Sequence, residues 1–406
     1  MNIKISPGTP KGKVIAPPSK SQAHRLLICA GLAKGKSVIA NVSLSRDILA
    51  TLHSLEALGV TYTIEGNTVT VEGCGGNPSP VSTLPCDESG STLRFLLPLA
   101  LLSGKETVLS GSPRLIERGV GIYQEVFAKN PIDISIGENQ IIVKGQITPA
   151  HFQIFGGVSS QFISGLMFAL PLLKKDSTLT VLPPVESRSY IDMTVEALKC
   201  FGVSVTETAP NSFFIKGGQS YQPQTLSVEG DWSNAAFLLA LAELSGEVQV
   251  EGLSQTTLQG DAIFPQYLLA LKEKNAVLDI SNCPDLAPIL FAMSAFFGSG
   301  ATFLGTKRLK IKESDRSAAM QGELSKMGCD LEIGENFVKV PPAILTSPKT
   351  PLCGHNDHRI VMALSVLLTR LGGEITEAEA VSKSYPDFFM ILKTLGIEVQ
   401  DVTFAK

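Results

Sequence analysis

The hydrophobic positions along this chain repeat in a coarse pattern. Six times, an apolar stretch with helical spacing ends in a small or basic turn and gives way to alternating residues of β type. Adjacent copies lie roughly 50 to 75 residues apart, too far for a solenoid repeat but suitable for a βαβ-containing subdomain. The pattern predicts six units in two lobes of three. The six predicted helix ends are 55–60, 126–131, 198–203, 271–276, 324–329 and 392–397.

At least three of these helix ends lead into a β-hairpin pattern. In 61–71 the alternation is interrupted by Gly66 and Asn67, a pair that tolerates positive φ. Similar patterns follow Gly202 and Gly328. The turn chemistry therefore predicts antiparallel strand pairs after these helices.

A lobe boundary is predicted near the Gly- and Pro-rich stretch 217–223. It lies between the third hairpin and a new helix that begins near Asp231, a good N-cap residue. An ordinary surface loop explains the same stretch equally well.

Composition sets the broad class. A length of 406 residues exceeds the size at which one core usually stops growing, so two domains are expected. The hydrophobic share of 44% and the many glycines are typical of a tightly packed α/β protein without long disorder. The net charge is −4 and no basic tract is present, which argues against a nucleic-acid-binding surface.

The cysteines and apolar runs indicate a location. Seven cysteines form an odd set without a C-x-x-C pair or a His at metal spacing, which predicts buried free thiols in a reducing compartment. The first seven residues lack the basic and apolar regions of a signal peptide. The apolar runs 93–102 and 289–297 are too short for a bilayer. We expect a cytoplasmic protein with no membrane association.

Six short polar clusters carry the candidate chemistry. Each pairs a basic residue with Ser, Gly, Asp, Glu or His, and they are too widely spread for one helix to gather them. If the fold brings them together, they form a pocket for an anionic small molecule. The clusters are 18–25, 88–94, 117–118, 312–316, 357–359 and 382–384.

Three polar stretches stand directly ahead of apolar helical patterns. They are 17–21, 87–94 and 156–162. Hydroxyls and free N–H groups at a helix start bind phosphate or carboxylate well. Serine capping alone explains any one of the three, but three of similar build favour an anion site.

The later clusters are more ambiguous. In 312–316, a solvated helix cap with local ion pairs of ~0.5 kcal/mol or less explains the charges. His355 and His358 are not at a zinc-binding spacing with a third ligand, so metal binding is not favoured. Arg359 precedes an apolar helical pattern and is well placed to hold an anion.

Taken together, the motifs resemble those of the 3-phosphoshikimate 1-carboxyvinyltransferases, the enolpyruvylshikimate-phosphate synthases. They occur in that family's order and span nearly the whole chain. They are Pro-Ser-Lys-Ser at 18–21 with Arg25, Ser-Gly-Ser-Thr-Leu-Arg at 89–94, Pro-Arg-Leu-Ile-Glu-Arg at 113–118, Ser-Ser-Gln at 159–161, Lys-Glu-Ser-Asp-Arg at 312–316, Asp-His-Arg at 357–359 and Lys-Ser-Tyr-Pro-Asp at 383–387.

The resemblance implies an α/β fold of two lobes, each with three βαβαββ-like units around a pseudo-threefold axis. It places one lobe, with most of the shikimate-phosphate contacts, at 19–228 and the other at 1–18 plus 229–406. The implied activity is transfer of the enolpyruvyl group of phosphoenolpyruvate to the 5-hydroxyl of shikimate 3-phosphate, with release of phosphate. This is a step of chorismate and aromatic amino acid biosynthesis, and it implies no metal, no organic cofactor and a monomeric transferase.

The resemblance also assigns residues. Asp285 and Glu313 would share the proton transfers that the chemistry needs, and Lys20 would stabilise the departing phosphate. A helix cap after Pro284 is the alternative explanation of Asp285. Shikimate 3-phosphate would contact Lys20, Ser21, Arg25, Ser159, Ser160, Gln161, Ser187, Asp285 and Lys312. Phosphoenolpyruvate would contact Lys20, Gly90, Arg118, Gln161, Arg316, Arg359 and Lys383.

Some positions depart from the common family pattern. Glu88 stands where an asparagine is often found, and Arg308 lies near another such position. Gly90 retains the small residue associated with binding glyphosate, so the resemblance predicts sensitivity to that inhibitor.

Two other functions stay open. An enolpyruvyl transferase acting on UDP-N-acetylglucosamine would share the fold, but its usual cysteine-bearing loop has no counterpart in 111–118. A catalytically silent phosphometabolite-binding protein would keep the pocket, yet anion binding gains nothing from two nearby carboxylates. Acceptor-dependent product formation distinguishes all three.

Overall fold

The computed structural model describes residues 1–128 and 130–403. The chain divides into two compact units, which we call the inserted unit (Pro18–Glu229) and the flanking unit (Met1–Pro17 with Gly230–Lys406). The boundaries implied by the resemblance lie one residue from this division. A boundary at 217–223 is wrong, because this loop leads into β14 (Thr225–Ser227), which pairs with β3 of the inserted unit.

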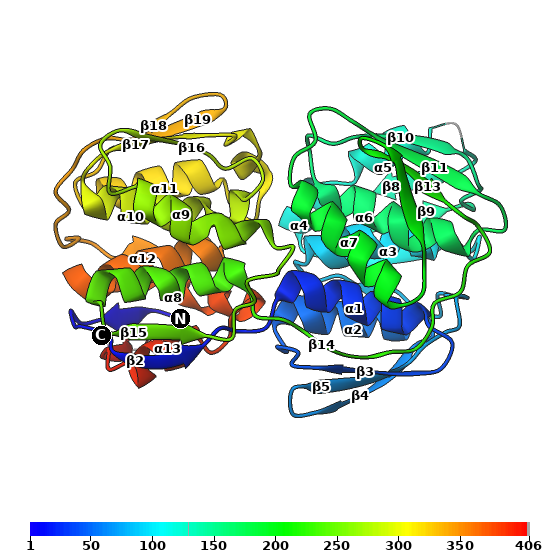
Figure 1. Cartoon of the computed structure of the whole chain (residues 1–406), viewed down its shortest axis with the longest axis horizontal. Helices are drawn as coiled ribbons and strands as arrows, with labels where there is room; N and C mark the ends of the chain where they lie inside the picture. Colours follow the sequence, from blue (N-terminus) through cyan, green and yellow to red (C-terminus); the bar gives the residue numbers. More distant parts are fainter. Residues whose placement is uncertain (129, 404–406) are drawn as a thin grey trace. The chain divides into compact units, whose positions relative to one another are not determined.

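In its described residues, the inserted unit contains three four-stranded sheets (Figure 1). Their strand orders are β14-β3-β5-β4, β6-β7-β9-β8 and β10-β11-β13-β12. In each sheet the first pair is parallel and the other two pairs are antiparallel. The remaining bounds are β3 Lys36–Ala40, β4 Thr61–Glu65, β5 Thr68–Glu72, β6 Leu84–Pro85, β7 Thr107–Ser110, β8 Asp133–Ile136, β9 Gln140–Lys144, β10 His151–Phe155, β11 Ser177–Leu182, β12 Val205–Ala209 and β13 Ser212–Ile215.

The flanking unit repeats this plan. Its sheets β20-β21-β1-β22 and β16-β17-β19-β18 have the same parallel and antiparallel pairs, and in the described residues the third sheet consists of the parallel pair β15-β2. The strands are β1 Ile3–Ile5, β2 Gly12–Ile15, β15 Val248–Glu251, β16 Ala276–Asp279, β17 Ala301–Leu304, β18 Glu332–Ile333, β19 Phe337–Val340, β20 Leu352–Cys353, β21 Gly373–Thr376 and β22 Val399–Asp401.

Helices connect the strands of each unit. Five of the six predicted helix ends contain the last residue of a helix, namely α2, α5, α7, α11 and α13, and α9 ends one residue before the sixth, 271–276. Residue 129 of the predicted end 126–131 lies outside the described residues. The helices of the inserted unit are α1 Lys20–Leu32, α2 Arg46–Ala57, α3 Gly90–Ala100, α4 Pro113–Glu117, α5 Gly121–Val126, α6 Ser160–Ala169, η1 Leu170–Leu172 and α7 Arg188–Cys200. Those of the flanking unit are α8 Trp232–Ser245, η2 Gly260–Ile263, α9 Phe264–Ala270, η3 Pro284–Leu286, α10 Ala287–Phe297, η4 Lys307–Ile311, α11 Arg316–Ser325, α12 His358–Leu371, η5 Ala378–Lys383 and α13 Phe388–Thr394.

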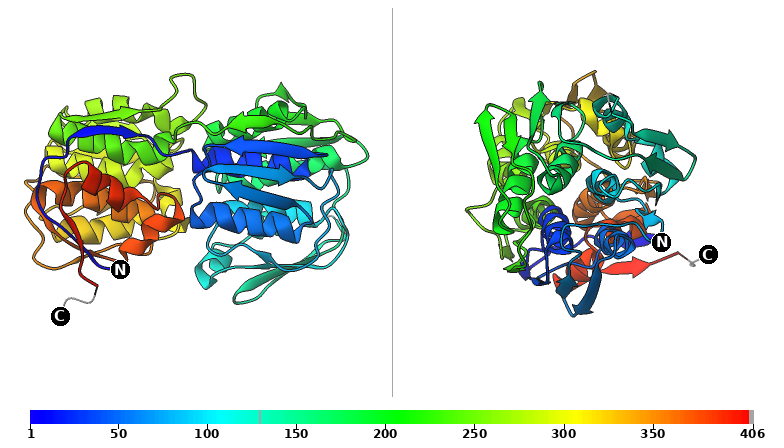
Figure 2. Two further views of the ribbon diagram at one scale, coloured as in Figure 1. Left: turned by 90° about the horizontal axis from the view of Figure 1, so that it is seen from below. Right: turned by 90° about the vertical axis from the view of Figure 1, so that its right-hand side faces the viewer.

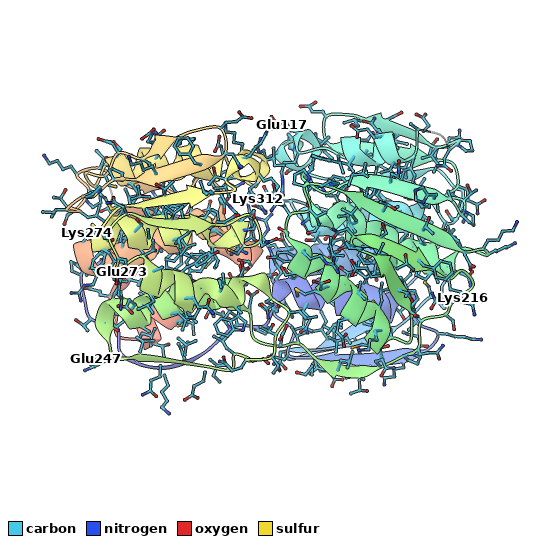
Figure 3. All side chains as sticks on the ribbon, turned by 45° about the horizontal axis from the view of Figure 1, so that its top comes forward. Glu117, Lys216, Glu247, Glu273, Lys274 and Lys312 are labelled. Atoms are coloured by element: carbon cyan, nitrogen blue, oxygen red, sulfur yellow. The ribbon has the colours of Figure 1, made fainter. Side chains whose placement is uncertain are left out.

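Each unit has its own hydrophobic core. Within each unit, sheets lie on the outside and helices between them, so helices such as α6 and α10 are buried on nearly every face (Figure 2). Charged side chains such as Glu247 and Lys274 extend from the surface (Figure 3). Gly165 permits close packing inside the inserted unit, because a Cβ there would lie 2.2 Å from Tyr123 Oη and 2.3 Å from the backbone oxygen of Arg94.

Several local predictions are tested by these elements. The three predicted hairpins are confirmed as β4-β5, β12-β13 and β18-β19, and Asp231 caps α8 by accepting from Asn234 N. All seven cysteines are free thiols, but Cys74, Cys200 and Cys353 are half-buried, so the expectation of buried cysteines is wrong for these three. Among the described residues, the apolar helices fall short of the length needed to span a membrane.

Candidate functional site

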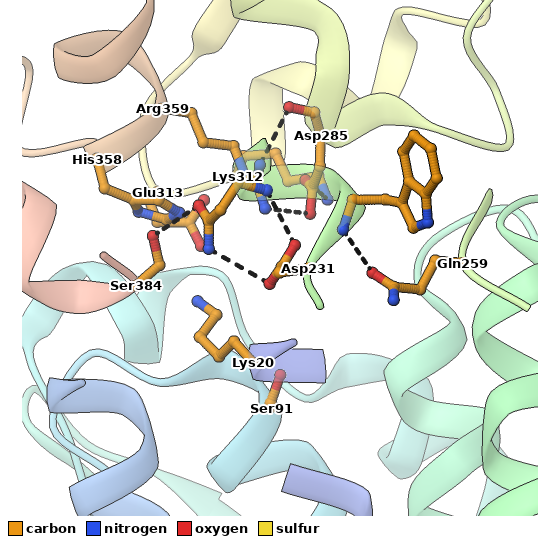
Figure 4. Close-up of polar contacts among 12 residues, drawn as sticks. Lys20, Ser91, Asp231, Gln259, Asp285, Lys312, Glu313, His358, Arg359 and Ser384 are labelled. Carbon is orange, nitrogen blue, oxygen red and sulfur yellow. Dashed lines mark hydrogen bonds and ion pairs between the residues drawn. The ribbon is translucent and has the colours of Figure 1, made fainter. Parts of the chain in front are cut away.

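Three cations converge on the carboxylate of Asp285 in the flanking unit. Figure 4 labels two of them, Lys312 and Arg359, beside Asp285. Its Oδ1 accepts hydrogen bonds from Arg316 Nη1 at 2.8 Å and Lys312 Nζ at 3.2 Å. Its Oδ2 accepts from Arg359 Nη2 at 3.0 Å. Asp285 lies inside η3, whose N-cap residue is Cys283, so the helix-cap explanation of Asp285 is wrong.

Arg316 is the centre of this cluster. Its side chain is 1% exposed, and besides Asp285 it donates to Glu313 Oε2 at 2.8 Å and Asp357 Oδ2 at 2.9 Å. Asp357 also caps α12, because its Oδ1 accepts from the backbone N–H of Arg359 at 2.9 Å. One buried guanidinium thus holds three carboxylates, and one of them, Asp357, is the N-cap residue of α12.

The charges of the cluster change one another's protonation equilibria. Burial by itself raises the pKa of Asp285, but Arg359, Lys312 and Arg316 lower it well below its usual value. Burial and the other cations lower the pKa of Lys312, although Asp285 opposes this shift. Burial by itself raises the pKa of Asp357, but the charge and hydrogen bond of Arg316 together with the charge of His358 lower it. Asp285 is therefore a carboxylate at neutral pH, held by cations and poorly basic while they hold it.

Two further cations of the flanking unit lie near helix starts. Lys383 Nζ, at the end of η5, donates to the backbone oxygen of Asn356 at 2.6 Å, next to the cap of α12. Arg308 is buried in η4 and donates to the backbone oxygen of Ser281 at 2.6 Å. Lys383 is thereby anchored to the residue before Asp357, which accepts a hydrogen bond from the backbone N–H of Arg359.

In the inserted unit, the three polar helix starts of the sequence are all capped by serine. Ser19, Ser89 and Ser159 accept from the backbone N–H groups of Gln22, Thr92 and Gln161. Capping therefore accounts for one hydrogen bond of Ser159, while its hydroxyl hydrogen is still available to a ligand. Ser160, which begins α6, is buried. Ser187 precedes α7 with φ of 56° and makes no side-chain cap hydrogen bond.

The two basic residues of α1 have different surroundings. Lys20, in the first turn, donates from Nζ to Asp47 Oδ2 at 2.6 Å. Arg25 is 2% exposed and donates to Ser21 O at 2.7 Å and Thr194 Oγ1 at 2.8 Å. Burial is the main cause that lowers the pKa of Arg25, to about 10. Arg25 joins α1 to α7, whereas Lys20 lies at the polar helix start.

Gly90, Arg118 and Gln161 are brought together around Arg94. Arg94 Nη1 donates to Gln161 Oε1 at 2.6 Å, and Nη2 donates to the backbone oxygen of Arg118 at 3.2 Å. A Cβ on Gly90 would lie 3.1 Å from Arg118 Nη2 and 3.4 Å from Gln161 Oε1. The amide nitrogen of Gln161 donates to Ser91 Oγ at 3.1 Å. The start of α3 is thus lined by the guanidinium groups of Arg94 and Arg118 and by the amide oxygen of Gln161.

The predicted site residues are divided between the two units. Asp285, Lys312, Glu313, Arg316 and Arg359 form one hydrogen-bonded cluster. Gly90, Arg118 and Gln161 lie together in the inserted unit, while Lys20, Ser21 and Arg25 share α1 and Ser187 precedes α7.

Sequence reasoning gave no role to three residues that hold these groups, although two of them, Arg94 and Asp357, belong to the polar clusters 88–94 and 357–359. Arg94 lies four residues after Gly90 on one helix, a spacing that puts both on the same face and could have revealed it. Asp47 and Asp357 become partners of Lys20 and Arg316 through the fold. Their distance along the sequence leaves no local signal for either pairing.

The chain is similar over nearly its whole length to one family of known proteins. The family model for EPSP synthase (3-phosphoshikimate 1-carboxyvinyltransferase) matches residues 6–392. The 3-phosphoshikimate 1-carboxyvinyltransferase of Clostridium kluyveri is 36% identical, with 100% of this chain and 99% of that protein covered. The enzyme of that name from Clostridium acetobutylicum is 37% identical, with 98% of each chain covered.

Solved structures show the same fold. An EPSP synthase from Acinetobacter baumannii superposes with a TM-score of 0.79 at 22% identity, covering 98% of this chain and 100% of that one. The enolpyruvyl transferase NikO from Streptomyces tendae gives a TM-score of 0.78 at 15% identity, with 98% of each chain covered. The α/β fold of enolpyruvyl transferases is confirmed, and this chain belongs to the EPSP synthase (3-phosphoshikimate 1-carboxyvinyltransferase) family.

Proposed function

We propose that this protein transfers the enolpyruvyl group of phosphoenolpyruvate to the 5-hydroxyl of shikimate 3-phosphate and releases phosphate. Membership of the EPSP synthase family supports the reaction. The observation that carries it is the cluster in which Arg316 joins Asp285 to Glu313. The carboxylates of Asp285 and Glu313 supply acid–base groups. Lys312 and Arg359, which both pair with Asp285, supply anion-binding groups in the same cluster.

The chemistry adds an O–H bond across the double bond of phosphoenolpyruvate and then eliminates phosphate. The acceptor oxygen bonds to C2 of phosphoenolpyruvate while its proton passes to a base and another proton reaches the methylene carbon. In the second step the C2–O bond to phosphate breaks, and a proton leaves the methyl group so that the double bond re-forms. We assign the proton transfers to Asp285 and Glu313, and stabilisation of the departing phosphate to Lys20.

The remaining assignments are proposals of the same standing. For shikimate 3-phosphate they rest on hydroxyls and cations at helix starts, which suit a phosphate. For phosphoenolpyruvate they rest on arginines, whose planar fork suits carboxylate and phosphate oxygens. The shikimate 3-phosphate residues are Lys20, Ser21, Arg25, Ser159, Ser160, Gln161, Ser187, Asp285 and Lys312. The phosphoenolpyruvate residues are Lys20, Gly90, Arg118, Gln161, Arg316, Arg359 and Lys383.

Product analysis with alternative acceptors tests this proposal. The purified protein is incubated with phosphoenolpyruvate and either shikimate 3-phosphate or UDP-N-acetylglucosamine, and the products are identified by mass spectrometry. An enolpyruvyl ether of shikimate 3-phosphate alone is expected. A product with the nucleotide sugar contradicts the acceptor assignment, and ligand binding without any product supports a silent binding protein instead.

We further propose that the enzyme acts as a monomer in the cytoplasm, as expected for a biosynthetic enzyme with free thiols. Light scattering across a range of protein concentrations tests the first part, and fractionation of the source cells tests the second. A mass of twice the monomer's or recovery outside the cytoplasm contradicts the respective statement.

A further inference from the structure

Arg94 is a buried cation that the proposed reaction leaves without a role. It lies on α3 with 5% of its surface exposed, and its guanidinium carbon stands 4.9 Å from the centre of the Phe162 ring. Its hydrogen bonds go to Gln161 Oε1 at 2.6 Å and to the backbone oxygens of Arg118 and Gly119 at 3.2 and 3.4 Å. One guanidinium therefore contacts two residues proposed to bind phosphoenolpyruvate.

The contact with Gln161 fixes which end of its amide can meet an anion. A carboxylate or phosphate oxygen accepts hydrogen bonds, so it can pair only with the amide nitrogen of Gln161. Arg94 holds the amide oxygen, and the nitrogen donates to Ser91 Oγ at 3.1 Å with one N–H group and has a second. With the amide turned over, the cation would face another donor. Arg94 therefore keeps the donating end of Gln161 available.

The contacts with the backbone position Arg118. Arg118 is the C-cap residue of α4, and its carbonyl and that of Gly119 belong to the turn that follows this helix. Nη2 of Arg94 holds both carbonyls. Consequently, the chain from which the Arg118 side chain extends is attached to α3, the helix that begins at Gly90.

We propose that Arg94 is a positioning residue for phosphoenolpyruvate: it orients the amide of Gln161 and anchors the turn that carries Arg118. This inference rests on the proposed function, since it takes both residues as ligands of that substrate. The three-way contact requires the planar fork of arginine. A lysine would keep the charge but could not hold an amide oxygen and two carbonyls with the same geometry.

Steady-state kinetics of Arg94→Lys test the inference. The KM for phosphoenolpyruvate is expected to rise about tenfold, the effect of losing one charge-assisted hydrogen bond. The KM for shikimate 3-phosphate, which shares Gln161 but not Gly90 or Arg118, is expected to rise less. Arg114→Lys is the matched control, because Arg114 is a partly exposed arginine of the same unit that pairs with Glu117. An unchanged KM for phosphoenolpyruvate in Arg94→Lys overturns the proposal.

A double-mutant cycle distinguishes positioning from a merely structural role. If Arg94 acts through Gln161, the effect of Arg94→Lys on the KM for phosphoenolpyruvate shrinks in a Gln161→Ala background. An effect of full size in that background, or equal rises of both KM values with a fall in Tm, overturns the proposal.

A measurement on the unsubstituted enzyme keeps the test independent of folding. The side-chain amide signal of Gln161 in a spectrum of 15N-glutamine-labelled protein is identified by its loss in Gln161→Ala. Phosphoenolpyruvate is expected to shift this signal, and an unmoved signal at saturating substrate overturns the inference. Turnover of the unsubstituted enzyme is measured first, so that a failure of the proposed function is recognised separately.

Discussion

Asp285 and Arg316 share a hydrogen bond of 2.8 Å between carboxylate and guanidinium, and the Arg316 side chain is almost inaccessible to solvent. The pair joins the proposed base to a proposed phosphoenolpyruvate ligand. An anionic substrate that approaches Arg316 therefore competes with a carboxylate already in contact with it. Asp285 is therefore expected to weaken the binding of phosphoenolpyruvate while it supports turnover as a base.

Replacing Asp285 separates these effects. In Asp285→Asn, turnover is expected to fall by about 100-fold or more because the base is lost. The affinity for phosphoenolpyruvate, measured by calorimetry with shikimate 3-phosphate present, is expected to hold or increase because the competing charge is gone. Asp330→Asn, the same change at an exposed position of the flanking unit, is the control. Weaker binding in Asp285→Asn alone contradicts the competition.

Arg316 is expected to matter for folding as well as for binding. Arg316→Met leaves Asp285, Glu313 and Asp357 without their shared cation, and breaking a buried ion pair in this way costs about 3–5 kcal/mol of unfolding free energy. Urea unfolding measures the loss. Arg370→Met, at an exposed position in the last turn of α12, is expected to cost less than about 0.5 kcal/mol. Equal losses in both variants would contradict the role given to Arg316.

Asp261 makes stability depend on pH. Burial, followed by the charge of Asp285, raises the pKa of Asp261 to about 6. The folded state therefore holds a proton that the unfolded chain releases near pH 4, so this carboxyl destabilises the protein increasingly as pH rises from about 4 to above 6. Asp261→Asn removes the effect.

The stability difference between this variant and the unsubstituted protein is the quantity to follow. Asp261→Asn is expected to gain on the order of 2 kcal/mol relative to the unsubstituted protein between about pH 4 and pH 8. Urea unfolding at both pH values measures the change. A difference that is the same at both would show that Asp261 does not titrate in this range.

Gly90→Ala tests the crowding at the start of α3. The added Cβ would stand 3.1 Å from Arg118 Nη2 and 3.2 Å from Arg94 Nη1, so these side chains must shift by a few tenths of an ångström. The KM for phosphoenolpyruvate and the inhibition constant for glyphosate are expected to rise, while Tm stays unchanged, because helical backbone accepts alanine. Unchanged kinetics with both compounds would place them away from Gly90.

The repeats of the fold were predictable because their signals are local. The helix end at 55–60 and the hairpin in 61–71 are each encoded by a few adjacent residues, as are the caps at Ser19 and Asp231. The degree of burial of Cys74 was not predictable, because it depends on packing between elements.

The candidate site was predictable as a set of residue types, but its partnerships were not. Local motifs contain Lys20, Arg316 and Arg359, yet nothing nearby in sequence indicates that Asp285 lies against two arginines 31 and 74 residues later. Similarly, the local pattern at Asp285 suits a helix cap after Pro284. Its actual role follows from charges that only the folded chain brings together.

Release of phosphate from phosphoenolpyruvate tests the central claim most directly. The protein and its Asp285→Ala variant are each incubated with phosphoenolpyruvate in a chelator, with and without shikimate 3-phosphate, and phosphate is followed over time. The account predicts release that requires shikimate 3-phosphate and is lost in the variant. Release without the acceptor, or none from the folded unsubstituted protein, would contradict it.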